Sequence, residues 1–367
     1  MRALFLLVLL AACTTDAPGD PAGAATEDAG LPALPPTDSL DLLFVVDASA
    51  PMEDEQNGLA ATLPRLVRSL LTGRRADGTL FGAVRSLHVG VVTADLGAGG
   101  HAMPTCEGRF GDDAQLRTTS RTGAAGCDAR YPSFLAVEGP SAADADALAA
   151  DLSCVLRAGT DGCRFVQPLE AMLKALTPAS SPLRFDADTA GQGEGGANDG
   201  FLRDDAALAV VVLTHADDCS SREPDLFGPG RYPIRDPRCH LFPDALHPVA
   251  RYVDGLLALE APQHVAVAVI AGLPTALAPA PGAPADFDGM LADPAMEERI
   301  DPHLGHRLVP SCNVPGMGVS FPPRRLVRFA QALEARGADA TVQSLCQRDI
   351  SIAVEDALHR IAGALRG

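Results

Sequence analysis

The sequence contains no tryptophan, a single lysine among 29 basic residues, and no Cys-x-x-Cys pair among its nine cysteines. The absence of Cys-x-x-Cys argues against a zinc ribbon or a thioredoxin-like redox site. No Gly-x-Ser-x-Gly motif is present either, so nothing indicates the nucleophile elbow of a serine hydrolase. We attribute the excess of arginine over the lone Lys174 to codon usage in GC-rich DNA.

Positive charge is also scarce, because 29 Lys and Arg residues face 47 Asp and Glu residues and leave a net charge of −18. A chain this acidic is repelled by the phosphates of nucleic acid and by anionic lipid headgroups, so nucleic acid is not an expected partner. Beyond the first residues, no segment has the length and apolarity of a membrane span. With 47% hydrophobic residues the chain can still bury one large core or two modest ones.

The first residues have the features of an export signal. Arg2 precedes the apolar run of residues 3–10, which is long enough for a signal peptide and too short to cross a bilayer. The run ends in Leu-Ala-Ala directly before Cys13, which resembles the bacterial lipobox. We therefore predict a signal peptide over residues 1–12 and a membrane anchor of diacylglyceryl and palmitate on Cys13. An ordinary secretory signal with an incidental cysteine is the alternative.

Residues 13–39 are predicted to hold the lipidated cysteine and a disordered tether. Alanine, glycine, proline and acidic residues dominate them up to about Pro36. Such a segment cannot bury enough apolar surface to offset the entropy lost on ordering. Thr14, directly after Cys13, resembles the sorting signal of lipoproteins destined for the outer membrane in Gram-negative bacteria. We therefore expect a lipid-anchored protein of the cell envelope, at the outer membrane.

The cysteines other than Cys13 predict disulfide bonds. Eight remain, an even number in a chain that we expect to be exported, so four disulfides are the default expectation. The sequence alone does not select the pairing. Joining nearest neighbours along the chain gives Cys106–Cys127, Cys154–Cys163, Cys219–Cys239 and Cys312–Cys346.

The order of apolar patterns predicts the fold class. Nearly continuous apolar runs indicate buried parallel strands at residues 40–46, 87–93, 206–213 and 265–270. Helical spacing of apolar residues alternates with them, at residues 55–71, 165–176, 245–259, 324–335 and 352–365. This alternation predicts an α/β fold with a doubly wound, mostly parallel, Rossmann-like sheet. We expect one domain over residues 40–367, with long disulfide-stapled insertions at about 97–160 and 219–244.

The residues after the first predicted strand carry a family resemblance. Asp47-Ala48-Ser49-Ala50-Pro51 resembles the Asp-x-Ser-x-Ser motif of von Willebrand factor type A domains. Thr160 and the end of the strand at residues 206–213 follow in the family's order, and the whole pattern resembles the A-type lipoproteins of myxobacteria. The resemblance implies a metal-ion-dependent adhesion site in which Asp47, Ser49 and Thr160 bind Mg²⁺ or another divalent cation.

The motif departs from the family pattern at two positions. Pro51 replaces the second serine, and His215 stands where the family has an aspartate. Proline offers no hydroxyl, and an imidazole nitrogen is a poor ligand for Mg²⁺, which prefers oxygen. Asp217 or Asp218 could supply the missing carboxylate. The alternative is that Asp47 and Ser49 cap the first helix and fix its loop without binding a metal.

Ligands of open α/β sheets bind beyond the carboxyl ends of the strands, where these residues and both insertions are expected to lie. We therefore predict a non-enzymatic binding or adhesion module whose partner is an envelope or extracellular protein. The first alternative is an envelope hydrolase that uses His215, Asp217 and Asp218. The second is a structural envelope protein without a ligand.

Overall fold

The computed structural model describes residues 34–367 except 107, 121–124, 140–141, 231–236 and 315–317. The predicted signal peptide, Cys13 and most of the predicted tether lie outside these residues. The described residues belong to one compact unit. No helix within them is both long enough and apolar enough to cross a membrane.

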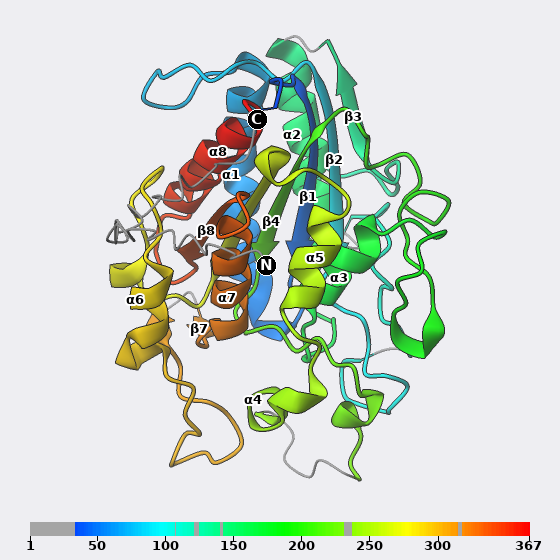
Figure 1. Ribbon diagram of the computed structural model, residues 1–367, viewed down its shortest axis with the longest axis vertical. Helices are drawn as coiled ribbons and strands as arrows, with labels where there is room; N and C mark the ends of the chain where they lie inside the picture. Colours follow the sequence, from blue (N-terminus) through cyan, green and yellow to red (C-terminus); the bar gives the residue numbers. More distant parts are fainter. Residues whose placement is uncertain (1–33, 107, 121–124, 140–141, 231–236, 315–317) are drawn as a thin grey trace, which may run out of the picture. The chain divides into compact units, whose positions relative to one another are not determined.

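A six-stranded sheet forms the centre of the described unit, in the order β3-β2-β1-β4-β5-β8 (Figure 1). All neighbouring strands are parallel except β2 and β3. The predicted α/β fold with a mostly parallel sheet is therefore confirmed. The strands are β1 (Ser39–Val46), β2 (Ser86–Thr93), β3 (Leu135–Glu138), β4 (Ala207–Leu213), β5 (Val265–Ala271) and β8 (Asp339–Ser344). A separate antiparallel pair joins β6 (Cys312–Val314) to β7 (Gly318–Ser320).

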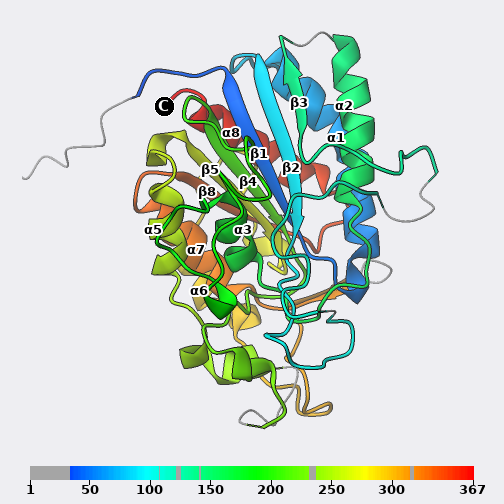
Figure 2. The same ribbon diagram turned by 90° about the vertical axis from the view of Figure 1, so that its right-hand side faces the viewer.

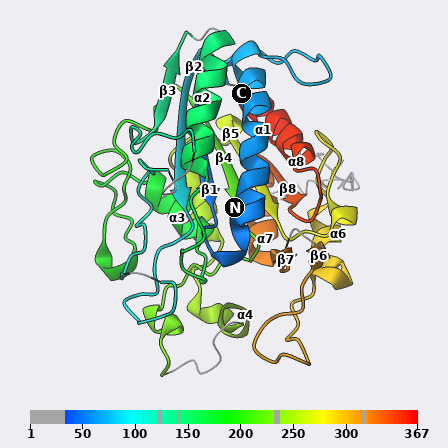
Figure 3. The same ribbon diagram turned by 180° about the vertical axis from the view of Figure 1, so that it is seen from behind.

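Helices cover both faces of the sheet, which is why the central strands β4 and β5 are apolar throughout and β1 is apolar except for Ser39 and Asp41 (Figure 2). On one face α1, α2 and α8 lie side by side (Figure 3). Successive side chains of β1 enter opposite cores, Leu42 and Phe44 toward this face and Leu43 and Val45 toward the other. The helices are α1 (Glu53–Thr72), α2 (Ala142–Leu156), α3 (Pro168–Leu176), α4 (Arg238–Leu241), α5 (Ala250–Leu257), α6 (Phe287–Ala292), α7 (Arg324–Glu334) and α8 (Ser351–Ala364).

Strand β8 has no counterpart among the predicted strands, because the side chains that it buries toward α8 are polar. Thr341 and Gln343 are fully buried, and both donate hydrogen bonds to Asp356 of α8, each at 2.7 Å. These bonds satisfy the Thr341 hydroxyl and the Gln343 amide nitrogen inside the core, although Gln343 Oε1 has no partner among the described residues. The elements β3 and α2 were also not predicted, and they lie within the segment 97–160 that we expected to be irregular.

The disulfides confirm two predicted pairs and correct the other two. Cys219–Cys239 and Cys312–Cys346 are present, with Cα–Cα distances of 5.5 and 6.2 Å. The predicted Cys106–Cys127 and Cys154–Cys163 bonds are wrong, because the structure joins Cys106 to Cys163 and Cys127 to Cys154. The Cys163 N–H donates to Asp95, 2.9 Å away in the loop after β2. That contact brings Cys163 to the loop that carries Cys106 and leaves Cys154, in the last turn of α2, beside Cys127.

The lone lysine ties the first insertion to α3. Lys174 is 2% exposed and donates hydrogen bonds to Asp113 and to Thr189. Its ammonium group also lies 5.4 Å from the ring centre of Phe110 and 5.7 Å from that of Phe185. These four contacts enclose the ammonium group. Lys174 therefore holds the loop of Asp113 against α3 and does not face solvent.

Removing the Cys127–Cys154 bond tests the corrected pairing. The free energy of unfolding of the double variant Cys127→Ser/Cys154→Ser should be lower by about 3 kcal/mol. Without the bond, the unfolded chain regains the entropy that the closed loop had lost. Urea unfolding at neutral pH measures this difference. Peptide mapping of the unreduced wild type should recover Cys106 linked to Cys163, and recovery of Cys106 linked to Cys127 would contradict the pairing.

Candidate functional site

The buried carboxylate of Asp47 is the centre of the candidate site. Asp47 directly follows β1, and Thr214 and His215 directly follow β4. These two strands are neighbours, and the strand order changes direction between them. The Asp47 Oδ2 atom accepts hydrogen bonds from His215 Nδ1 at 2.8 Å and from the Thr214 hydroxyl at 2.9 Å. Its Oδ1 atom accepts the backbone N–H of Ser49 at 2.8 Å. Asp47 has no exposed surface, so these donors replace water.

Asp47 is held in its charged form. Burial alone would raise the pKa of Asp47, but the His215 imidazole and the donors of Ser49 outweigh burial and lower it. Since a carboxylate only accepts hydrogen bonds, His215 Nδ1 is the donor of this pair. His215 Nε2, the other ring nitrogen, has no hydrogen-bond partner in the part of the chain that is described, and the residue lines a cavity.

The loop that carries Thr160 lies against the loop of Asp47 and Ser49. The Gln56 side chain of α1 donates to the carbonyl oxygens of Asp47 at 2.9 Å and of Gly159 at 2.8 Å. The sequence therefore correctly indicates that these segments meet at the carboxyl edge of the sheet. The Gln56 amide, which the resemblance did not suggest, joins them together with a backbone hydrogen bond of 2.9 Å from Gly162 N–H to the Ala48 carbonyl oxygen.

The donor arrangement at Asp47 does not fit a divalent cation. Mg²⁺ needs accessible oxygen ligands in octahedral array, whereas the Asp47 carboxylate has no exposed surface and its Oδ2 already accepts from both His215 and Thr214. Across the described ranges, no three or more His, Cys, Asp or Glu residues are grouped to hold a metal. The helix-capping alternative is wrong for the Ser49 hydroxyl, which makes no capping bond to the short turn Ala50–Met52.

Asp217 and Asp218 accept hydrogen bonds from the N-termini of two helices. Among the described residues, neither of them is hydrogen-bonded to His215. Asp217 accepts the backbone N–H groups of Arg325 at 2.8 Å and Leu326 at 3.2 Å, in the first turn of α7. Asp218 accepts the N–H of Leu169 in α3 at 3.1 Å and the Arg325 guanidinium at 3.1 Å. Desolvation and the nearby Glu298 carboxylate raise the pKa of Asp217 to about 7.

A cavity of about 510 Å³ opens beside His215 at this edge of the sheet. Both insertions build it, because Pro104 and Thr105 of the first and Cys239 and His240 of the second line its wall. The Cys219–Cys239 disulfide forms part of the wall. Sequence reasoning missed the wall residues of the 299–309 hairpin, because a short hairpin closed by single backbone bonds leaves no apolar period to detect.

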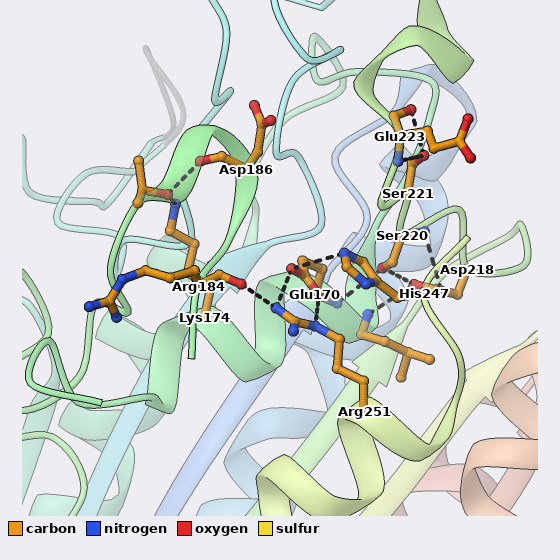
Figure 4. Close-up of polar contacts among 12 residues, drawn as sticks. Glu170, Lys174, Arg184, Asp186, Asp218, Ser220, Ser221, Glu223, His247 and Arg251 are labelled. Atoms are coloured by element: carbon orange, nitrogen blue, oxygen red, sulfur yellow. Dashed lines mark hydrogen bonds and ion pairs between the residues drawn. The ribbon is translucent and has the colours of Figure 1, made fainter. Parts of the chain in front are cut away.

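A largely buried polar network joins α3 and α5 to the loop after β4 (Figure 4). Glu170, in the first turn of α3, accepts two hydrogen bonds from Arg251 of α5, each at 3.0 Å. The Ser220 hydroxyl donates to Asp218 at 2.6 Å and accepts the Glu170 N–H at 3.1 Å. Burial raises the pKa of Glu170, and burial together with nearby guanidinium groups lowers the pKa of His247 to about 4.

Comparisons with known proteins add little to this geometry. No protein-family model and no curated protein matches the chain. Among solved structures, the human COPII-coat protein Sec24c gives a TM-score of 0.27 at 15% identity. The match covers 65% of this chain and 27% of that one, and so low a score carries no argument about function.

The low pKa of His247 predicts a loss of stability in acid. The unfolded chain binds a proton at His247 near pH 6.5, whereas the folded chain binds it only near pH 4, so acidification through this window favours unfolding. Asp217, with its raised pKa, acts in the opposite direction, and a comparison of variants separates the two groups. Between pH 7 and 4.5, the wild type should lose roughly 2 kcal/mol more than His247→Gln, after allowance for solvent screening.

Urea unfolding of both proteins at the two pH values measures this difference. Equal losses in the wild type and in His247→Gln would show that His247 is not the acid-sensitive group.

Proposed function

We propose that the chain is a lipid-anchored, von Willebrand A-like binding module of the cell envelope that holds a protein partner in the cavity beside His215. The observation that carries the proposal is the position of this cavity, at the carboxyl edge of the sheet and next to the loops that follow β1 and β4. Open α/β sheets bind their ligands at this position.

The build of the cavity supports binding. Its volume of about 510 Å³ suits a small ligand or a few side chains of a partner. Its walls include a disulfide and lie on the apolar cluster shared by the two insertions. Loops held rigidly before a ligand arrives lose less entropy when it binds, which favours affinity.

Binding here does not need a divalent cation, in our proposal. Protein donors take the oxygens of Asp47, and His215 provides the contact that the family resemblance assigns to a metal ligand. Pro51, which lacks a hydroxyl, is tolerated for the same reason. The adhesion-type module would therefore keep its partner in the presence of a chelator.

One observation favours a hydrolase as the second candidate. A buried carboxylate that accepts a hydrogen bond from Nδ1 orients an imidazole to act as a general base through Nε2. However, the Ser49 hydroxyl lies 3.5 Å from Nδ1, the nitrogen that already faces Asp47, so it is not placed as a nucleophile. Hydrolytic turnover that disappears in His215→Ala would favour this second function.

Capture from envelope extract tests the binding proposal. Full-length protein in detergent should retain the same partner with EDTA and with Mg²⁺. The Leu308→Asp variant should lose it, because Leu308 lines the cavity and a charge there disrupts apolar contact. Leu304→Asp is the matched control, since Leu304 lies in the same hairpin, is 43% exposed and does not line the cavity.

The binding proposal fails if no partner is retained. Retention of the partner by both variants alike would place its binding site elsewhere on the chain. Retention only with Mg²⁺ would contradict the cation-independent site.

The proposed anchor is tested separately at Cys13. Cells fed labelled palmitate should incorporate the label into the wild type and not into Cys13→Ser, because only the thiol accepts the lipid. The variant should also leave the membrane fraction. Undiminished labelling of Cys13→Ser would refute lipidation at this residue.

A further inference from the structure

We infer that the cavity recognises a carboxylate carried on an apolar or aromatic body, and that Arg307 is the group that binds the carboxylate. The inference rests on the proposed function, because it names the chemistry that a partner would present to this cavity.

The acidic groups of the wall already have partners within the protein. Asp218 is bonded to Arg325, and Asp217 accepts the N–H groups at the start of α7. Glu298 lies 3.5 Å from His240 Nδ1 and 3.9 Å from Arg324 Nε. Each carboxylate that lines the cavity in the described part of the chain thus faces a cationic or N–H group of the protein.

Arg307 is placed differently. It belongs to the 299–309 hairpin, in which Ile300 pairs with Leu308 and the N–H of Asp301 donates to the carbonyl of Arg307 at 2.9 Å. Arg307 forms an ion pair with Asp301, whose Nε–Oδ2 distance of 3.8 Å is, like that of the Glu298–Arg324 pair, too long for a hydrogen bond. Arg307 Nε is buried and has no hydrogen-bond partner among the described residues.

Arg307 Nε has almost no exposed surface, so a ligand from the cavity meets the terminal nitrogens of the guanidinium group rather than Nε. The Arg307 side chain as a whole is 41% exposed, so a ligand can reach it from the cavity. A guanidinium group binds a carboxylate through two parallel N–H donors, which gives the contact direction as well as charge. These properties point to an anionic oxygen group as the polar end of the ligand.

The remaining wall defines the rest of the ligand. Phe165, Phe321 and Leu308 line the same cavity, so an apolar or aromatic body is the complementary shape. Glu298 and Asp217 also face the cavity and would repel a phosphate dianion more strongly than a carboxylate. A monoanionic carboxylate is therefore favoured, from an acidic side chain, a peptide C-terminus or a small organic acid.

Matched probes test this inference on the full-length protein in detergent by isothermal titration. 4-Phenylbutyrate should bind, whereas 4-phenylbutanamide and 4-phenylbutylamine, which have nearly the same shape, should bind at least about tenfold more weakly. Arg307→Gln should weaken 4-phenylbutyrate binding by about tenfold and leave the amide unchanged. Arg336→Gln is the control, since Arg336 is 55% exposed, pairs with Asp254 and does not line the cavity.

Peptide probes identify the source of the carboxylate. Phe-containing tripeptides with a free or an amidated C-terminus, and an amidated peptide with a central glutamate, separate a terminal carboxylate from a side chain. The inference is overturned if the acid binds no better than its amide, if no probe binds, or if Arg307→Gln binds the acid as the wild type does. A captured protein partner that 4-phenylbutyrate fails to displace would also overturn it while leaving the proposed function intact.

Discussion

The burial of one carboxylate at the end of β1 determines how the carboxyl edge of the sheet is built. Asp47 has no contact with water, and a charge in that position must be matched by donors fixed in the protein. Those donors come from the end of β4 and from the turn after Asp47 itself. The hydrogen bond to Asp47 thus orients the ring of His215 through Nδ1. This orientation leaves Nε2 for the cavity.

The same rule extends to the other acidic groups of this edge. Asp217, Asp218 and Glu170 each accept hydrogen bonds from a helix N-terminus, an arginine or a hydroxyl group nearby. Acidic residues therefore hold the helices to the sheet, although the chain as a whole is strongly acidic. Among the described wall residues, Arg307 Nε in the 299–309 hairpin is the buried donor that has no hydrogen-bond acceptor. This distinguishes the hairpin from the rest of the site.

The sequence predicts those parts of the molecule that depend on local patterns. The apolar runs of β1, β4 and β5 indicate buried parallel strands, and the ends of such strands necessarily bring Asp47 and His215 together. Strand β8 escapes prediction because Asp356, distant in sequence, supplies the partners of its buried Thr341 and Gln343. The pairing of Cys106 with Cys163 likewise follows from a contact between distant segments, and Arg307 lies in a short hairpin whose few backbone bonds leave no periodic pattern.

The burial of Lys174 has a practical consequence for work on this protein. Among the described residues, the single ε-amino group is enclosed by Asp113, Thr189 and two phenylalanine rings. Reagents that couple to primary amines would therefore find no accessible side chain on the folded unit, and a surface label or a covalent cross-link has to be directed at carboxyl groups instead. Reaction at Lys174 itself would report the opening of the first insertion, so an amine-specific reagent becomes a probe of local unfolding rather than a means of attachment.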